Sequence, residues 1–556
     1  MAVRAPAHDV VVIGSGAGGA AAAWRLCEKG LNVLLLEAGP AFNPARDYKL
    51  NQNDWERHLF PEPPGSRMEV AMGELGALDS RDVDLRSWNR ATGPLVRGDR
   101  RQAAGPGYWH VAGVGGSTLH FVGESHRMHP EAMRMRTRFG VAADWPLTYE
   151  DLEPYYVLCE QLVGVAGPAQ QSGRWRSQPY PLPAHPLSPP ALRLQAAGSR
   201  LGMRWEANSR AALSQTYDGR PACNYCGNCS RGCPIGDKGS ADVTFIRKAQ
   251  ATGRLKLQTD SPVVRLHTAP NGRIESVSVV RNGRMHRVPT PALVLAAGAV
   301  QTPRLLLASA SLHWRQGLSN SSGQVGRNFM ETLFWSSAGI VPELANSHAG
   351  LPSDAICWDF NAPDSIPSVA GGCRFNSNTQ EIGFTGPISY ATRLIGGFGA
   401  ELKAGVRSSF GRALSVGALG EFLPNDNSFV DLHPTQHDSR GVPLARVHSE
   451  LGDTNTRRLR FMASKARQLL RETGASEPLE EFSAWDQFSA THVFGTCRMG
   501  QHAKDSVVNE QGRSHDHANL FIADASVFPS SGGGESPALT IHALAVRTAD
   551  ALASKG

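Results

Sequence analysis

Hydrophobic residues near the N-terminus occur in short runs that are separated by glycines or by charged positions. Val10–Ile13 and Val33–Leu36 are apolar runs of the length that forms strands buried on both faces of a sheet. The alanine-rich stretch between them is long enough for one helix. This order predicts a strand, a helix and a second, parallel strand at the start of the chain.

A similar order returns at residues 291–310, PALVLAAGAVQTPRLLLASA. This segment predicts a buried strand, a turn of small residues and a helix. Pro303 suits the first turn of that helix, because a proline there removes no hydrogen bond. We therefore expect the sheet that begins at the N-terminus to receive strands from distant parts of the chain.

Three glycines follow the first apolar run in G-x-G-x-x-G spacing: Gly14, Gly16 and Gly19. In a dinucleotide-binding turn the first permits a tight bend, the second lets the backbone approach a pyrophosphate, and the third lets the helix pack closely on the strand. Glu37 ends the second apolar run, where a carboxylate can accept hydrogen bonds from ribose hydroxyls. Together these residues predict a dinucleotide at the helix N-terminus.

The central part of the chain has a different pattern. Between Thr332 and Glu480, short alternating runs separated by turn residues predict an antiparallel sheet that roofs a substrate pocket. Residues 177–190, SQPYPLPAHPLSPP, predict an extended crossing between domains, since proline fits neither a helix interior nor a central strand. We thus expect an α/β protein whose Rossmann-like domain is interleaved with an α+β substrate domain built on an antiparallel sheet. The expected Rossmann-like domain comprises residues 8–45, 90–125, 225–330 and 490–553, and the expected substrate domain comprises residues 46–89, 126–224 and 331–489.

The composition limits the class of protein further. A chain of 556 residues with 41% hydrophobic and 19% charged residues is typical of a folded protein with more than one core. A net charge of +6, with basic residues that do not alternate with aromatic ones, argues against a nucleic-acid partner. No apolar run approaches the roughly 20 residues that cross a bilayer. The residues before the first strand lack the pattern of a signal peptide, so the sequence predicts a cytoplasmic protein.

Several separated motifs occur together in order along the chain. They are the N-terminal fingerprint, GVGGSTLHFVG (113–123), WPLTYEDLEPYY (145–156), AAGAVQTPRLLLASA (296–310), GQVGRN (323–328), HVFGTCRMG (492–500), and ADASVFP leading into SPALTIHALAVRTAD (536–550). With them, the chain resembles the glucose-methanol-choline (GMC) oxidoreductase family over nearly its whole length. The resemblance implies bound FAD, alcohol-oxidising chemistry and interleaved FAD-binding and substrate-binding segments.

The same resemblance suggests which residues contact FAD. The expected contacts are Gly14, Gly16, Gly19, Glu37, Gly115, Gly116, Ser117, His120, Val264, Asp524, Ala525 and Pro537. His120 is similar in position to a histidine through which some members of the family attach the flavin covalently. The alternative is an unlinked imidazole that hydrogen-bonds the flavin or tunes its charge.

The H-x-x-G-T segment supplies the expected catalytic base. In the family, the histidine of this segment is the active-site base, and the matching residue is His492. An imidazole, whose ordinary pKa is about 6.5, can take the proton of an alcohol while the flavin takes the hydride. Relatives usually have Asn or His before the proline of the last motif, whereas this chain has Ser536. The Ser536 hydroxyl is the expected second catalytic group, with Glu535 and His542 as alternatives.

Four cysteines lie within CNYCGNCSRGCP, namely Cys223, Cys226, Cys229 and Cys233. The spacing C-x2-C-x2-C-x3-C-P is the run with which bacterial ferredoxins bind iron–sulfur clusters, so a 3Fe-4S or 4Fe-4S cluster is the first interpretation. Zinc, disulfides and plain thiols are the alternatives. The sugar dehydrogenase catalytic subunits of the family resemble this chain most in the cysteine run, where three of the thiols match a C-x5-C-x3-C pattern. Long-chain alcohol oxidases have a similar stretch.

A cluster would accept electrons one at a time from the flavin, which takes up two. This predicts a cytochrome or a quinone as acceptor rather than oxygen. Sugar dehydrogenase subunits of this type also resemble proteins that leave the cytoplasm with a small signal-bearing subunit, so the periplasm is the alternative compartment. A group of arginines could form a docking face for an acidic partner, although an ordinary solvated surface is the favoured interpretation. These are Arg97, Arg100, Arg101, Arg127, Arg134, Arg136 and Arg138.

The favoured function is an FAD-dependent dehydrogenase that oxidises a CH–OH group of a sugar, a glycoside or another alcohol. Two alternatives stay open. One is a long-chain or sterol alcohol oxidase that uses oxygen. The other is a non-redox flavoprotein, such as the hydroxynitrile lyases of the family, that keeps FAD as a scaffold.

Overall fold

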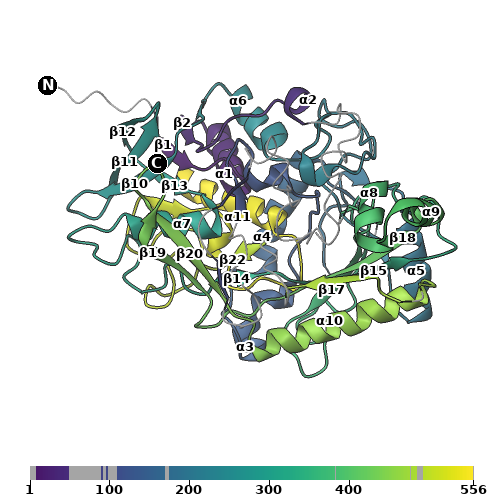
Figure 1. Ribbon diagram of the computed structural model, residues 1–556. Coiled ribbons are helices and arrows are strands. Elements are labelled where there is room, and N and C mark those ends of the chain that lie inside the picture. Colours follow the sequence, from purple (N-terminus) through teal and green to yellow (C-terminus); the bar gives the residue numbers. More distant parts are fainter. Residues whose placement is uncertain are drawn as a thin grey trace.

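Two larger sheets organise the part of the protein that the computed structural model describes (Figure 1). The described residues are 8–48, 89–91, 95–97, 109–169, 174–381, 383–475, 477–484 and 492–554. One sheet is parallel and one is antiparallel, which confirms the predicted α/β class.

The parallel sheet has five strands in the order β23-β13-β1-β2-β9, and every neighbouring pair is parallel. The strands are β1 (Val10–Ile13), β2 (Val33–Leu36), β9 (Leu255–Gln258), β13 (Leu293–Leu295) and β23 (Leu520–Ile522). The first two are buried along their whole length, as their unbroken apolar sequence predicts. Because the other three come from distant segments, the sheet is assembled from discontinuous parts of the chain, as expected.

Two helices from opposite ends of the chain cover this sheet together. Helix α1 (Ala17–Glu28) packs against α11 (Ala538–Ala553), and Figure 1 shows the two side by side. A 2.7 Å ion pair between Arg25 and Asp550 joins them. A Cβ on Gly18 would lie 1.6 Å from the carbonyl oxygen of Ala523, and one on Gly19 would lie 1.8 Å from that of Gly14. Only glycines allow α1 to approach the sheet this closely.

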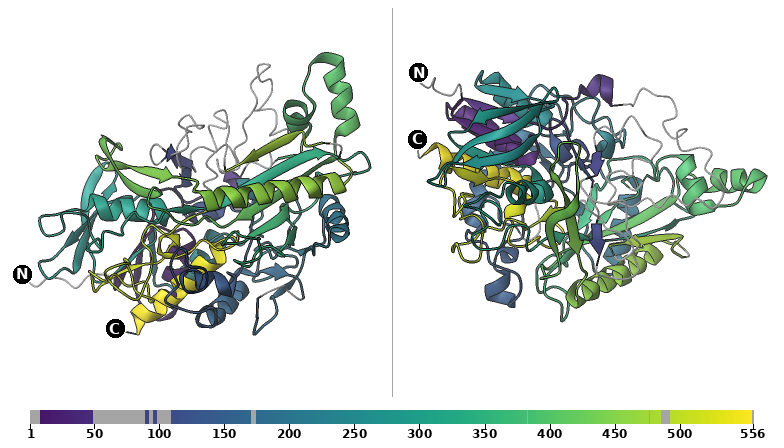
Figure 2. Two further views of the ribbon diagram at one scale, coloured as in Figure 1. Left: turned by 90° about the horizontal axis from the view of Figure 1, so that it is seen from below. Right: turned by 60° about the vertical axis from the view of Figure 1, so that its left-hand side comes forward.

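The antiparallel sheet has six strands in the order β21-β15-β18-β17-β16-β8. The strands are β8 (Glu206–Ala207), β15 (Leu333–Ile340), β16 (Ala355–Cys357), β17 (Cys373–Ser377), β18 (Ala413–Gly420) and β21 (Glu480–Ser483). The predicted antiparallel sheet between residues 332 and 480 is thus confirmed, although the edge strand β8 precedes that range. The long helix α10 (Asp453–Glu472) lies along this sheet and packs on β15 and β18 (Figure 2).

Smaller sheets and helices complete the described chain. The small sheets are β10 (Val263–Thr268) with β11 (Ile274–Arg281) and β12 (Arg284–Pro289); β19 (Phe429–His437) with β20 (Pro443–Ser449) and β4 (Leu95–Arg97); β3 (Asn89–Ala91) with β5 (Trp109–Val111); β14 (Met330–Glu331) with β22 (Val493–Phe494); and β6 (Ala166–Gly167) with β7 (Leu182–Pro183). The remaining α-helices are α2 (Pro44–Asp47), α3 (Met135–Phe139), α4 (Tyr149–Val163), α5 (Pro189–Arg200), α6 (Arg247–Ala251), α7 (Gly298–Ala308), α8 (Pro387–Ser389) and α9 (Gly399–Ser409). Short 3₁₀ turns are η3 (Gly116–Leu119), η4 (Pro130–Met133), η5 (Cys229–Arg231) and η8 (Ala525–Val527), and π-helical turns are η6 (Asp242–Ile246) and η7 (Tyr390–Ile395).

Two details of the expected helices are wrong. Residues 177–188 lie outside helices as predicted, but Pro189 and Pro190 form the first turn of α5, where proline is well tolerated. Pro303 lies in the interior of α7 rather than in its first turn. The proline ring leaves the carbonyl oxygen of Ala299 without its helical donor, and the hydroxyl of Thr496 donates to this oxygen at 2.6 Å. The H-x-x-G-T motif therefore compensates for the proline.

Replacing Thr496 by Val removes this hydroxyl and leaves the buried Ala299 carbonyl without a donor. We expect Thr496→Val to cost about 1–3 kcal/mol of stability and to lower the midpoint of thermal unfolding, followed by circular dichroism. Ser408→Ala removes an exposed hydroxyl that bonds the Gly405 carbonyl and is expected to change stability by less than about 0.5 kcal/mol. Equal midpoints for the two variants would contradict the compensating role.

Candidate active site

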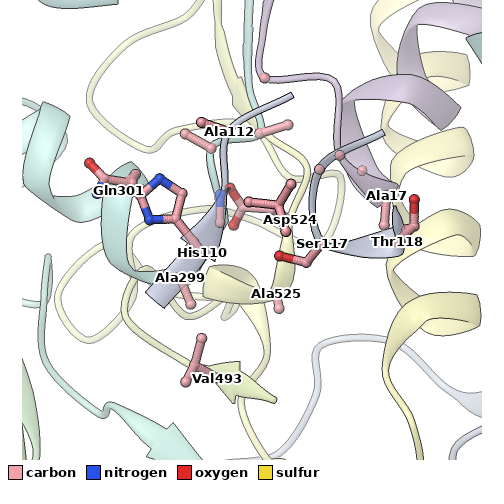
Figure 3. Close-up of a pocket in the computed structure, with 18 of the residues that line it drawn as sticks. Ala17, His110, Ala112, Ser117, Thr118, Ala299, Gln301, Val493, Asp524 and Ala525 are labelled. Atoms are coloured by element: carbon pink, nitrogen blue, oxygen red, sulfur yellow. Dashed lines mark hydrogen bonds between the residues drawn. The ribbon is translucent and has the colours of Figure 1, made fainter. Parts of the chain in front are cut away.

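A cavity of about 760 Å³ lies at the carboxyl ends of the parallel strands, where the antiparallel sheet faces them. Ligands of open α/β sheets bind at this edge. The parallel side contributes the turn after β1, the end of β2 and the segments after β13 and β23, and the antiparallel side contributes residues of β17 and β18. Figure 3 shows part of the wall, with Ala299 and Gln301 from α7 and Val493 from β22.

The glycine turn after β1 is held by Glu37. One carboxylate oxygen of Glu37 accepts hydrogen bonds from the Ser15 backbone N–H at 2.9 Å and from the Ser15 hydroxyl at 2.6 Å. The other oxygen accepts from the Gly39 N–H at 2.9 Å. Burial raises the pKa of Glu37, against these hydrogen bonds, which lower it. The carboxylate thus fixes the turn and also lines the cavity.

A second glycine turn packs directly on the first. Gly115 and Gly116 have φ values of +106° and +54°, and the Gly115 N–H donates to the Ser15 hydroxyl at 3.3 Å. A Cβ on Gly116 would lie 2.7 Å from the Cα of Gly16. The two backbones therefore cross with no side chain between them. The N-terminus of α1 is left facing the cavity, which fits the pyrophosphate of a dinucleotide.

Asp524 joins three elements at the middle of the cavity wall. Its carboxylate accepts hydrogen bonds from Gly298 N–H at 2.9 Å, from the Thr302 hydroxyl at 2.5 Å and from Ser526 N–H at 2.8 Å. These bonds connect the end of β23 to the start of α7. Because the carboxylate is committed to them, Asp524 sets the shape of the wall on which Ala525 also lies (Figure 3).

Ten of the twelve residues expected to contact FAD line this cavity. The two that do not are Gly19 and Gly115, which allow close packing and a tight turn. The lining residues reach from Glu37 and Val264 through both glycine turns to Pro537. A single elongated site of this kind fits a dinucleotide.

His492 lies on the same wall, just before β22. Its Nδ1 is 3.2 Å from the hydroxyl of Thr332, and its Nε2 has no partner among the described residues. Burial lowers the pKa of His492 to about 4, and Arg374 acts in the same direction, whereas Glu124 opposes them. The imidazole is therefore neutral near pH 7, as a proton acceptor must be.

Of the three candidates for the second polar group, Ser536 alone lines the cavity. Its backbone N–H donates to Nδ1 of His126 at 2.9 Å, and Nε2 of His126 bonds Asn208 at 2.8 Å. Glu535 is committed elsewhere, because one of its oxygens accepts from Arg174 at 2.7 Å. His542 is buried with its ring 4.7 Å from that of Phe245.

Four polar residues in or behind the cavity wall were missed by reasoning from the sequence. Glu124, Asn376 and Glu381 line the cavity, and Arg374 forms a buried 2.5 Å ion pair with Glu124. Glu124 directly follows the GVGGSTLHFVG motif, so its place could have been inferred. The other three lie in or after β17, where the pattern marks a strand but does not show which side chains face a cavity.

His120 lies between the cavity and the cysteine-rich segment. It lines the cavity, and its Nδ1 is 2.8 Å from the carbonyl oxygen of Ser230. Fully buried Lys238 donates to the carbonyl oxygens of Leu119 at 2.8 Å, Phe121 at 3.0 Å and Cys229 at 2.7 Å. The cysteine-rich segment is thus fixed directly behind the wall that carries His120.

Among the described residues, no group of three or more His, Cys, Asp or Glu side chains is arranged to hold a metal ion, so the positions of the four thiols do not support the predicted iron–sulfur cluster. All nine cysteines are free thiols, which does not support the disulfide alternative. Cys226 is exposed, whereas Cys229 and Cys233 are buried, and burial raises their pKa values to about 11 and about 12. The Cys233 thiol donates to Asp237 at 2.7 Å.

The expected exposure of the arginine group, as a solvated surface or as a docking face, is wrong at Arg127. This side chain is fully buried and forms ion pairs with Glu153 at 3.0 Å and Glu160 at 2.8 Å. Arg136 and Arg138 are exposed, while Arg100 and Arg101 lie outside the described residues. Arg127 can be buried because two carboxylates pair with its positive charge.

Comparisons with known proteins define the class to which this fold and site belong. A family model described as "GMC oxidoreductase" matches residues 113–333, a second with the same description matches residues 424–545, and one described as "FAD binding domain" matches residues 9–48. The fructose dehydrogenase large subunit of Gluconobacter japonicus is 30% identical over 98% of this chain and 97% of its own length. The 6'''-hydroxyparomomycin C oxidase of Streptomyces lividus is 30% identical over 98% of this chain and 91% of its own.

The chain belongs to the GMC oxidoreductase family, and it is an oxidoreductase of the class that uses FAD. The crystal structure of pyridoxine 4-oxidase from Mesorbium loti matches with a TM-score of 0.63 over 98% of this chain and 99% of that chain, at 21% identity, and so supports the fold. Among the described helices, none has the length and apolar character needed to span a membrane.

Gly116→Ala tests the crossing of the glycine turns. The added Cβ would push on the Gly16 backbone, so we expect less than about a tenth of the wild-type FAD content after purification, measured from flavin absorbance per chain. Gly30→Ala is the matched control, because Gly30 also has a positive φ, +90°, but has nothing within 4 Å of a Cβ. That variant should keep its FAD and lose only about 1 kcal/mol of stability. Full flavin content in Gly116→Ala would contradict the fit of FAD to this cavity.

Proposed function

We propose that the protein is an FAD-dependent dehydrogenase that oxidises a CH–OH group of a sugar, a glycoside or another alcohol to a carbonyl. The observation that carries the proposal is a neutral imidazole, that of His492, on the wall of the cavity that the dinucleotide fingerprint also lines. FAD supplies the acceptor of the hydride when it is bound. The residues of the chain position the alcohol and move its proton.

In this proposal His492 is the general base. Thr332 holds Nδ1 and so orients the ring, which leaves Nε2 to take the O–H proton of the substrate. Loss of that proton makes the carbinol carbon a better hydride donor. The negative charge of Glu124 stabilises the imidazolium that then forms. Ser536 bonds the reacting oxygen of the substrate through its hydroxyl.

The other sequence assignments are part of the same proposal. The positions of ten of the expected FAD contacts around the cavity, His120 among them, support these assignments. The boundaries of the interleaved domains and a covalent flavin bond at His120 stay predictions. An oxidase that uses oxygen is the second candidate, because four relatives are named oxidases.

The electron acceptor follows from the dehydrogenase proposal. A relative named as a large subunit supports a partner chain, so we propose a small subunit and a cytochrome or quinone acceptor. The cytoplasm, or the periplasm after export with that subunit, stays a prediction. The iron–sulfur cluster also stays a prediction from the cysteine spacing, and no step above depends on it.

We expect His492→Ala to slow anaerobic reduction of the flavin by sugars and alcohols by roughly two to four powers of ten. FAD content should not change, because the side chain is proposed to act on the substrate. Stopped-flow absorbance of the flavin measures the rate, and His286→Ala, at an exposed position of β12, is the control. Unchanged turnover in His492→Ala would exclude His492 as the base. A wild-type flavin that no hydroxylic substrate bleaches would favour the non-redox alternative.

Iron and acid-labile sulfide analysis of anaerobically purified protein tests the cluster. We expect three or four iron atoms per chain if the cysteine run binds a 3Fe-4S or 4Fe-4S cluster. Cys229→Ser should abolish iron binding. Cys226→Ser should keep a three-iron cluster, since the C-x5-C-x3-C pattern omits Cys226. Iron-free wild-type protein would contradict the prediction.

A further inference from the structure

Glu381 is a carboxylate of the cavity wall that neither the proton transfer nor the expected FAD contacts use. One of its oxygens accepts a hydrogen bond from the hydroxyl of Ser353, and the other has no partner among the described residues. Ser353 in turn accepts a hydrogen bond from Nδ2 of Asn376 at 3.1 Å. Ser353 thus links the two residues, because its hydroxyl accepts from Asn376 and donates to Glu381.

The backbone at Ser353 is built for this arrangement. Its φ is +52°, in the left-handed region that a serine seldom occupies. The Ser353 carbonyl oxygen accepts hydrogen bonds from Asn208 at 2.8 Å and Arg210 at 3.0 Å, which hold the turn in place. Backbone strain that the surrounding structure enforces is characteristic of functional sites.

Asn376 adds a second acceptor to the same wall. Both hydrogens of its amide are used, by Ser353 and by the Ser377 carbonyl at 3.2 Å, and its Oδ1 is buried without a partner among the described residues. Gly417 is its cross-strand neighbour and also lines the cavity. A Cβ on Gly417 would lie 2.9 Å from this Oδ1, so only a glycine fits beside the acceptor.

Of the two carboxylates Glu124 and Glu381, only Glu381 keeps an oxygen without a hydrogen-bond partner among the described residues. Both oxygens of Glu124 are used, by Arg374 at 2.5 Å and by Asn208 at 2.9 Å. Arg210 donates to backbone carbonyls, including that of Pro352. Burial, and then repulsion by Glu124, raise the pKa of Glu381, while Ser353, Arg210 and Arg374 oppose them. A further anion would add to this repulsion, whereas a hydroxyl donor would relieve it.

We propose that Glu381 determines substrate specificity: with Asn376 it binds hydroxyl groups of the substrate other than the one that is oxidised. The wall thereby selects a neutral polyhydroxylated substrate over an aldonate and over an alcohol with a single hydroxyl. A substrate that lacks the matching hydroxyl leaves the acceptor without a hydrogen bond, and this free-energy cost weakens its binding. This inference rests on the proposed function and names the substrate class of the same site.

The test compares Glu381→Gln with wild type on D-glucose, D-fructose, D-sorbitol, D-gluconate and 1-hexanol. D-Sorbitol, D-gluconate and 1-hexanol share six carbons but differ in charge and in the number of hydroxyls. For the best neutral substrate, we expect Glu381→Gln to lower kcat/KM about tenfold to a hundredfold, mainly through KM, because a charge-assisted hydrogen bond is lost. Discrimination against D-gluconate should fall at least about tenfold. FAD content should be unchanged.

Three further variants separate specificity from folding and from catalysis. Glu401→Gln, at an exposed position of α9, is the matched control and should behave as wild type. Glu381→Asp keeps the charge, so it should keep the discrimination against D-gluconate. In a His492→Ala background turnover is slow, so the substrate-induced change in flavin absorbance gives Kd. Adding Glu381→Gln to this background should raise Kd by the same factor by which Glu381→Gln alone raises KM.

The outcomes distinguish this inference from the function on which it rests. A wild-type flavin that none of the five compounds reduces means that the proposed function has failed. Reduction by a neutral sugar or polyol, with unchanged selectivity in Glu381→Gln, overturns the role of Glu381 and leaves the function standing. A wild-type enzyme that prefers D-gluconate or 1-hexanol to the neutral sugars and polyol would also overturn the proposed role of Glu381.

Discussion

Gly16 and Gly116 cross at a distance that no side chain could occupy, and much of the rest of the site depends on this contact. The first glycine precedes α1, and the second begins the segment that carries Ser117 and His120. Ser15 reinforces the crossing, because its hydroxyl bonds both Glu37 and the Gly115 N–H. A side chain at Gly116 would push the two turns apart, because its Cβ would lie 2.7 Å from the Cα of Gly16.

At His492, charge and burial oppose each other. His492 is kept neutral by burial, although a carboxylate, Glu124, lies close enough to favour its protonated form. Arg374 limits that effect by pairing with Glu124. The same carboxylate raises the pKa of Glu381 by repulsion. One ion pair therefore influences both the group proposed to take the proton and the group proposed to select the substrate.

The sequence was informative where the chemistry needs a particular residue at a particular spacing. The fingerprint glycines, Glu37 and His492 could be placed because glycine alone permits the turns and imidazole suits the proton transfer. The parallel and antiparallel sheets followed from the apolar runs. Pro303 was placed wrongly because the proline deprives a carbonyl oxygen of its helical donor, and the hydroxyl of Thr496, almost two hundred residues away, donates to this oxygen instead.

Residues on the antiparallel side could not be found in this way. Asn376 and Glu381 become neighbours only through Ser353 and the register of β17 with β18, which periodicity does not specify. Arg127 looked like a surface charge because its partners, Glu153 and Glu160, lie on a helix whose packing the local sequence does not reveal. Long-range pairing of this kind is decided by tertiary structure.

The central claim is that the imidazole proposed as the base is neutral at physiological pH. Its most direct test is the pKa of His492 in the FAD-loaded protein, measured by NMR on histidine-labelled enzyme and assigned by comparison with His492→Asn. The account predicts a value near 4, well below the ordinary value of about 6.5. A pKa above physiological pH would show a ring that is mostly cationic and unable to accept the proton, and would contradict the account.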